Sequence, residues 1–167
     1  PVNSAGNSGE APWHYISVPA DAFDILAVGA VGEDRMLADF SSRGPSADGR
    51  VKPDVSAMGF GTIGLDGGGT NVAPINGTSF ASPLVAGLVA CLWQLHPDRT
   101  AHEIMDAVRR SASQYDDPDG DLGYGIPDFW RAHLLLGGRD LTQLSAPTVL
   151  SLIPVPFAEL CYIELYA

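Results

Sequence analysis

The sequence predicts an α/β fold in which buried parallel strands pack against helices. Residues 24–32 read DILAVGAVG, a nearly continuous apolar run of the kind found in strands covered on both faces. Residues 79–96 form a longer apolar run, which is typical of a central helix buried on nearly all sides. Residues 100–113 open with the capping-box pattern Thr-x-x-Glu and continue with amphipathic helical spacing. A buried strand followed by two such helices favours an α/β architecture.

Composition limits the classes of function. The 167 residues suffice for one domain with a hydrophobic core, and 46% hydrophobic against 17% charged residues argues against a disordered chain. The net charge of −11 comes from scattered Asp and Glu, and no Lys/Arg cluster offers a phosphate-binding surface, so nucleic acid is not expected as a partner. The longest apolar run, 80–95, is shorter than the roughly 20 residues that cross a bilayer, so no membrane span is expected.

The other elements follow from local signals. Residues 1–9 have the pattern of a buried strand end running into a Gly/Asn/Ser turn. Residues 39–69 are dense in Gly, Ser, Asp and Pro, which predicts loops around a short strand near 51–57. A final helix is expected in the segment IPDFWRAHLLLGG, opened by its proline and stopped by its glycines. Phe129 and Trp130 in that helix are expected to pack in the core.

The start of the long apolar helix has a pattern suited to nucleophilic catalysis. The stretch NGTSFASPLVAG places Thr78 and Ser79 after Gly77 at the mouth of the helix, facing a cleft. A serine hydroxyl needs a base to remove its proton, and donors to stabilise the oxyanion that forms on the substrate. Unpaired N–H groups and the helix dipole favour negative charge at this place. Gly-Thr-Ser before a helix is by itself usually a capping pattern, so catalysis requires a partner donor.

Asn7 can provide that donor. It lies in the segment SAGNSG, a tight turn at the end of the first expected strand, and its side chain carries an amide. A serine at a helix mouth and an asparagine on a loop together predict an oxyanion hole.

Several motifs, in order, resemble those of the subtilisin-like serine proteases, the subtilases of peptidase family S8. SAGNSG is similar to their oxyanion asparagine motif and NGTSFASPLVAG to their serine motif, with ILAVGAV, FSSRGP and KPDVSAMG between them. The resemblance covers residues 2–136. It implies a subtilisin-like parallel sheet flanked by helices, and a serine endopeptidase that cleaves protein or peptide substrates through an acyl-enzyme. Met58 stands where the family often has proline, which concerns only local turn geometry.

The resemblance also implies roles for individual residues. Ser79 would be the nucleophile, and Asn7 the oxyanion-hole side chain, with the Ser79 N–H as the second donor. The residues expected to line the substrate site are Ala5, Gly6, Ser8, Ser17, Ala20 and Thr78.

Two members of the catalytic triad are expected outside this sequence. Subtilases carry Asp, then His, then Ser along the chain, so the first two are expected upstream of Pro1. The sequence starts without an initiator methionine or a signal peptide, which favours a piece of a longer protein. An upstream segment of the same protein would then supply Asp and His together with the N-terminal strands. The chain alone is expected to be inactive.

None of the histidines present is expected to replace the upstream base. His14 lies in a loop, while His102 and His133 lie in helices beside charged residues. His96 ends the apolar helix, more than about 20 Å from Ser79 at 1.5 Å per residue. A general base must lie within about 3 Å of the hydroxyl.

No cofactor or metal is expected, and calcium stays open without support from the sequence. Residues 117–121 superficially resemble a calcium loop, but Leu122 stands where that loop needs a glycine and no Glu occupies the twelfth position. A solvated turn is expected there. Cys91 is expected to be a small core residue, and a disulfide to Cys161 is left open.

The pattern changes near the end of the chain. Residues 1–138 are assigned to the C-terminal part of a subtilase catalytic domain, 139–148 to a linker, and 149–167 to the start of a β-rich sorting domain. The segment LIPVPFAELCYIELYA resembles the opening of a type IX secretion sorting domain, with Val155 in place of an asparagine. That resemblance implies a secreted or cell-surface bacterial protein.

The alternative is a non-catalytic subtilase-like module that binds partners or serves as a scaffold, its upstream triad residues lost. The presence of both Ser79 and Asn7 argues against this alternative, because a scaffold needs neither.

Overall fold

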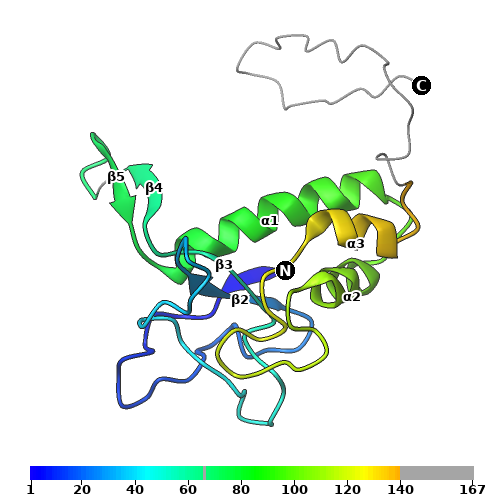
Figure 1. Cartoon of the computed structure of the whole chain (residues 1–167). Helices are drawn as coiled ribbons and strands as arrows, with labels where there is room; N and C mark the ends of the chain where they lie inside the picture. The colour runs from blue at the N-terminus through cyan, green and yellow to red at the C-terminus, as the bar shows by residue number, and fades with distance from the viewer. Residues whose placement is uncertain (66, 140–167) are drawn as a thin grey trace.

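A three-stranded parallel sheet forms the centre of the molecule (Figure 1). The computed structural model describes residues 1–65 and 67–139. The strands β1 (Val2–Ser4), β2 (Leu26–Val31) and β3 (Val55–Met58) lie in the order β1-β2-β3. Val28 of β2 pairs with Ser4 on one side and Val55 on the other, both in parallel register. The predicted α/β fold with a parallel sheet is confirmed.

The central strand β2 is buried along its whole length, as its apolar run predicts. Its side chains alternate between two clusters because successive strand residues point to opposite faces. Leu26 and Val28 pack in the main core with the helices. Ala27 packs on the other face in a small cluster with Ala5, Ile16 and Ala20. Helices therefore cover one face of the described sheet, and a loop segment covers the other.

Within residues 67–139, three helices follow the sheet: α1 (Thr78–Leu95), α2 (Ala101–Ser111) and α3 (Phe129–Leu135). The α2 capping box is confirmed, because the Thr100 side chain accepts the Glu103 N–H while the Glu103 carboxylate accepts the Thr100 N–H. The final helix begins at Phe129, two residues later than Pro127, because the Asp128 side chain caps it by accepting the Arg131 N–H.

One pair of strands was not predicted. β4 (Thr62–Leu65) and β5 (Val72–Ile75) form an antiparallel hairpin that projects from the body of the molecule (Figure 1). The expectation of loops up to residue 69 is therefore wrong at 62–65. The third strand also begins at Val55 rather than 51.

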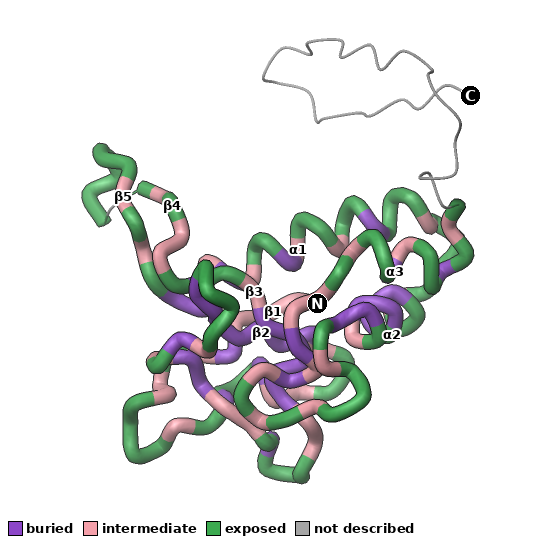
Figure 2. Tube along the Cα trace, in the orientation of Figure 1, coloured by how far each residue is buried: buried purple, intermediate pink, exposed green. Residues whose placement is uncertain are grey.

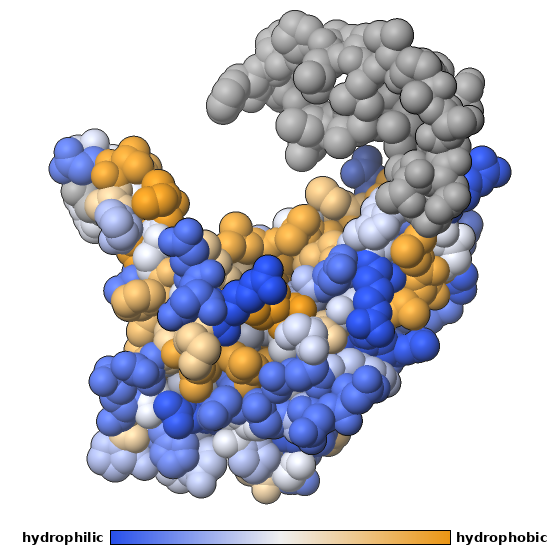
Figure 3. Space-filling model, viewed as in Figure 1, coloured by the Kyte–Doolittle hydropathy of each residue, from blue (hydrophilic) through white to orange (hydrophobic). Residues whose placement is uncertain are grey.

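The expectation that α1 is buried on nearly all sides is also wrong. Its buried residues Thr78, Ala81, Val85 and Leu92 lie against the sheet and the other helices, while an adjoining face carries an exposed stripe of Leu84, Leu88, Cys91 and Leu95. Much of α1 is accordingly coloured as exposed in Figure 2 and as hydrophobic in Figure 3. These residues follow helical spacing, so one face of the described helix lacks a covering layer. Cys91 is thus exposed rather than in the core, and Trp130 is 40% exposed.

Among the described residues, α1 is also the one helix long and apolar enough to cross a membrane, judged by length and composition. Core helices of soluble proteins meet the same criterion, and α1 packs its buried residues in one core with the sheet. Residues 140–167 lie outside the described part, and with them the predicted sorting-domain segment, most of the linker and Cys161.

The exposed stripe predicts self-association of the chain. Size-exclusion chromatography with light scattering should show oligomers whose share grows with concentration, because pairing buries Leu88 and Leu95, which are 48% and 60% exposed. Leu88→Lys should reduce that share, whereas the control Val18→Lys, in an exposed loop, should not. A monodisperse monomer of the original chain at high concentration would contradict the prediction.

Candidate active site

The turn that follows β1 meets the first residues of α1. The Thr78 backbone N–H and the Thr78 hydroxyl both donate to Asn7 Oδ1, each at 2.9 Å. The Gly6 N–H donates in turn to Thr78 Oγ1 at 3.2 Å. Three hydrogen bonds thereby join segments that are about 70 residues apart in sequence and fix the oxygen side of the Asn7 amide.

The nitrogen of that amide and the Ser79 hydroxyl flank one point above Gly77. A Cβ built on Gly77 would stand 3.0 Å from Ser79 Oγ and 3.5 Å from Asn7 Nδ2. Gly77 also has a φ of 154°, a conformation that side chains rarely adopt, so only glycine suits this position. Asn7 and Ser79 are both exposed, so both side chains can be reached by a substrate.

Two hydrogen-bond donors at this point have no partner among the described residues. Asn7 Nδ2 has none, because only the oxygen of the amide is engaged by Thr78. The Ser79 N–H lies in the first turn of α1, where backbone donors have no intrahelical acceptor, and Gly77 offers no side-chain cap. Two free donors beside a serine hydroxyl can stabilise a negative oxygen formed by attack of that hydroxyl.

The residues expected to line the substrate site differ in how far they are buried. Gly6 and Ser8 are half-buried and Ser17 is exposed, and all three surround the Asn7 turn: Ser17 Oγ would lie 2.9 Å from a Cβ on Gly6. Ala5 and Ala20 are fully buried in the small cluster beneath the turn. Thr78 is 1% exposed and contacts Asn7, so its side chain supports the turn from within the protein. Their contacts with substrate stay predictions.

Ser42 contacts the Asn7 turn but is not among the residues that the sequence predicts for the site. It lies in FSSRGP, donates its N–H to the Gly6 carbonyl at 2.9 Å, and accepts the Ser8 N–H on Oγ at 3.0 Å. Nothing in its local sequence indicates a contact with a turn 34 residues away.

The four histidines are engaged elsewhere. His96 and His133 bond to each other at 2.9 Å, and His14 packs on Tyr15. His102 Nε2 lies 2.8 Å from Asp24 Oδ1, a pair that superficially resembles two members of a triad. Asp24 precedes β2, whereas Asn7 follows β1, so about 20 Å of parallel strand separates that pair from Ser79.

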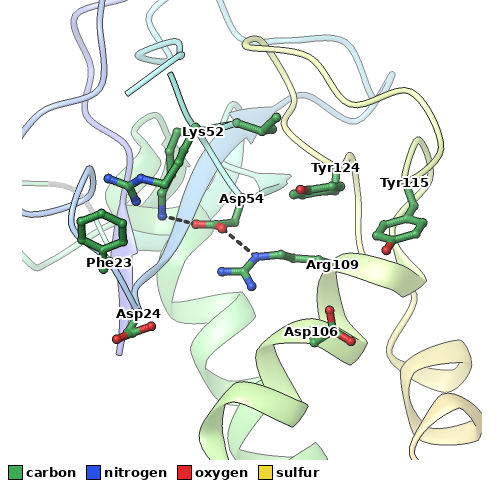
Figure 4. Close-up of a pocket in the computed structure, with 10 residues that line it drawn as sticks. Phe23, Asp24, Lys52, Asp54, Asp106, Arg109, Tyr115 and Tyr124 are labelled. Atoms are coloured by element: carbon green, nitrogen blue, oxygen red, sulfur yellow. Dashed lines mark hydrogen bonds and ion pairs between the residues drawn. The ribbon is translucent and has the colours of Figure 1, made fainter. Parts of the chain in front are cut away.

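A hollow of about 350 Å³ lies at the end of the sheet where β2 and β3 begin (Figure 4). Its floor is a buried ion triad in which Asp54 accepts from Lys52 Nζ at 2.6 Å and from Arg109 Nε at 2.7 Å. Asp54 also accepts the Ala27 N–H at 2.7 Å, which ties the triad to the central strand. No serine or cysteine among the described residues lines this hollow, and the triad anchors β3 and α2 to β2.

Metal ligands do not gather in the part of the chain described here: no three His, Cys, Asp or Glu side chains are placed to share an ion. In the acidic turn, Asp119 Oδ1 accepts the N–H groups of Asp121 and Leu122 at 2.9 and 2.7 Å. That carboxylate therefore closes the turn.

The histidine pair between α1 and α3 predicts a pH-dependent stability. Burial, followed by the charges of His133 and Arg99, lowers the pKa of His96 from its ordinary 6.5. The unfolded chain binds this proton more readily, so the pair contributes stability that is complete above pH 6.5 and is lost as pH falls through the lowered pKa. The urea midpoint should drop between pH 7.5 and 5.5, and drop less in His96→Asn. The control His14→Asn should follow the original chain; equal drops in all three would contradict the prediction.

Comparisons with known proteins give one consistent result. The model of the subtilase family matches residues 1–125. The chain is 31% identical to subtilisin-like protease SBT6.1 of Arabidopsis thaliana over 99% of this chain and 17% of that protein. It is 31% identical to the serine protease AprX of Bacillus subtilis over 73% of this chain and 32% of that protein.

The fold agrees with solved structures. The prenylagaramide maturation protease PagA superimposes with a TM-score of 0.66 and 27% identity, over 82% of this chain and 50% of that chain. The chain therefore spans about half of this solved relative and no more than a third of these two curated ones.

Proposed function

The chain belongs to the subtilase family of serine proteases, and we propose that it supplies the nucleophile and the oxyanion hole of a subtilisin-like serine endopeptidase. The observation that carries the proposal is the arrangement around Gly77, where Ser79 Oγ and Asn7 Nδ2, both on exposed residues, flank one point. Because Thr78 holds the amide oxygen of Asn7, the nitrogen is left to bind substrate.

In the proposed reaction, Ser79 Oγ attacks the carbonyl carbon of a peptide bond. Its proton passes to a histidine, and the carbonyl oxygen becomes an oxyanion that accepts from Asn7 Nδ2 and the Ser79 N–H. The histidine then protonates the leaving amine, and an ester forms on Ser79. Water, deprotonated by the same histidine, hydrolyses the ester and releases the second product.

The histidine and its aspartate partner are proposed to come from an upstream segment of the same protein. All four histidines of this sequence lie among the described residues, and Ser79 is not among their hydrogen-bond or ring partners. The same segment is the proposed cover of the exposed α1 stripe, which explains in one step the missing base and the uncovered helix face.

The substrates proposed are proteins or peptides, and the place of action is outside the cell or at its surface. The proposed place rests on the family resemblance alone. Fractionation of the source cells, with immunodetection of the protein, tests the location.

The proposal is tested by comparing this chain with the longer protein that includes its upstream coding region. The chain alone should neither cleave a fluorogenic peptide nor react rapidly with a fluorophosphonate, because Ser79 has no base. The longer protein should do both. Rapid acylation of Ser79 in the chain alone would overturn the need for an upstream base, and a longer protein inert in both assays would favour the scaffold alternative.

A further inference from the structure

The backbone of the turn that carries Asn7 is held by the neighbouring residues, while Asn7 itself is held through its side-chain oxygen. Among the described residues, the Asn7 backbone makes no hydrogen bond, and its side chain is held only through Oδ1. The adjoining residues Gly6 and Ser8 are both tied to Ser42. The backbone at Asn7 is therefore clamped one residue before and one residue after.

Ser42 is well suited to act as that clamp. It is 0% exposed, its N–H donates to the Gly6 carbonyl at 2.9 Å, and its Oγ accepts the Ser8 N–H at 3.0 Å. Ser42 Oγ would also lie 2.8 Å from a Cβ on Gly6, so it packs directly against the turn. The Gly9 N–H also donates to the Phe40 carbonyl at 2.9 Å, which is a further hydrogen bond between the same two loops.

We infer that Ser42 is a positioning residue for the oxyanion hole: by bracketing Asn7 it sets the place from which Nδ2 donates to the substrate oxygen. The inference rests on the proposed function. Loss of the Oγ acceptor frees the Ser8 N–H and loosens one end of the clamp, while the backbone bond to Gly6 remains. The effect of Ser42 on the reaction passes through Asn7, and Ser42 itself contacts no reacting atom.

The adjacent serine is a matched control. Ser41 is also 0% exposed, and its Oγ also accepts a backbone N–H at 3.0 Å, but that N–H belongs to Ala30 in β2. Replacement of either serine with alanine removes one hydrogen bond from a backbone N–H to a serine hydroxyl at 3.0 Å, part-buried at Ser42 and buried at Ser41. Both variants lose one hydrogen bond, so a difference in kcat between Ser42→Ala and Ser41→Ala reflects where the lost bond lies.

The kinetic test uses the longer protein and a peptide substrate. Ser42→Ala should lower kcat roughly tenfold with KM little changed, because a misplaced donor weakens mainly the transition state. Asn7→Ala should lower kcat by about 10²–10³, the scale for loss of one oxyanion donor in a subtilisin. Adding Ser42→Ala to Asn7→Ala should change kcat by less than about twofold, since coupled residues are not additive. Ser41→Ala should keep the original kcat.

Two outcomes separate the inference from the proposed function. In the first outcome, Asn7→Ala lowers kcat, but Ser42→Ala has the same kcat as Ser41→Ala, or its effect on kcat multiplies with that of Asn7→Ala in the double variant. The positioning role is then wrong and the proposed function stands. If Asn7→Ala and Ser79→Ala both leave activity unchanged, the proposed function itself fails.

A second readout needs no activity and uses this chain at low concentration. Hydrogen exchange measured by mass spectrometry should speed up in the 5–10 region of Ser42→Ala, including the Gly6 amide that donates to Thr78. In Ser41→Ala the faster exchange should appear in β2 instead. Unchanged exchange at residues 5–10 in Ser42→Ala would overturn the clamp.

Discussion

Replacement of Ser79 with alanine is expected to abolish peptide cleavage by the longer protein, with a loss in kcat on the scale of about 10⁶ found when a subtilisin loses its serine. The reason is chemical, because alanine has no oxygen to form the acyl-enzyme. KM should change little, since Ser79 lies on an exposed helix mouth and its removal leaves the binding surface in place. The measurement is steady-state kinetics with a fluorogenic peptide, together with fluorophosphonate labelling.

Ser82 offers the matched control for that experiment. It is the fifth residue of the same helix, three residues after Ser79, and is half-buried. Ser82→Ala should retain labelling and most of the activity. Cleavage that survives Ser79→Ala, or disappears equally in Ser82→Ala, would show that Ser79 is not the nucleophile.

Replacement of Asp54 with asparagine is expected to lower the free energy of unfolding by about 3–5 kcal/mol. The Asp54 carboxylate is shared by Lys52 and Arg109, and the side chains of Asp54 and Lys52 are each 4% exposed. Asparagine keeps the size of the side chain but leaves two cations without their counter-charge, one of them buried. Urea unfolding followed by tryptophan fluorescence, at low protein concentration, measures the loss.

Asp106→Asn is the control for charge removal at the same hollow. Asp106 also lines it, but its side chain is 58% exposed and pairs with Arg110 at 3.6 Å. Exposed pairs of this kind contribute at most about 1 kcal/mol. Equal losses for the two variants would mean that the buried triad has no special share in the stability of the fold.

The elements that could be predicted from sequence are those with strong local signals. The apolar run of β2, the start of α1 and the Thr100–Glu103 capping box were all correctly predicted, because burial and capping leave patterns within a few residues. The β4–β5 hairpin left no such pattern. Its strands have four residues each and are partly exposed, and the glycine-rich turn between them dominates the local composition.

Long-range features explain the other differences. The exposure of Cys91 depends on which layers surround α1. Apolar residues occur both on a helix face that packs within the described chain and on one that another segment covers, so the two faces look alike in sequence. Likewise, Asn7 and Ser79 could be singled out by chemistry and by family resemblance. Ser42 could not, because its contact with the Asn7 turn depends on how two loops fold together.

The central claim is that Asn7 and Ser79 bind one oxyanion, and it is tested most directly by the crystal structure of the longer protein after reaction with a peptidyl phosphonate. We expect a phosphonyl group on Ser79 Oγ, with one of its oxygens about 2.7–3.1 Å from both Asn7 Nδ2 and the Ser79 nitrogen. A phosphonyl group on another residue, or one on Ser79 whose oxygens all face away from Asn7, would contradict the account.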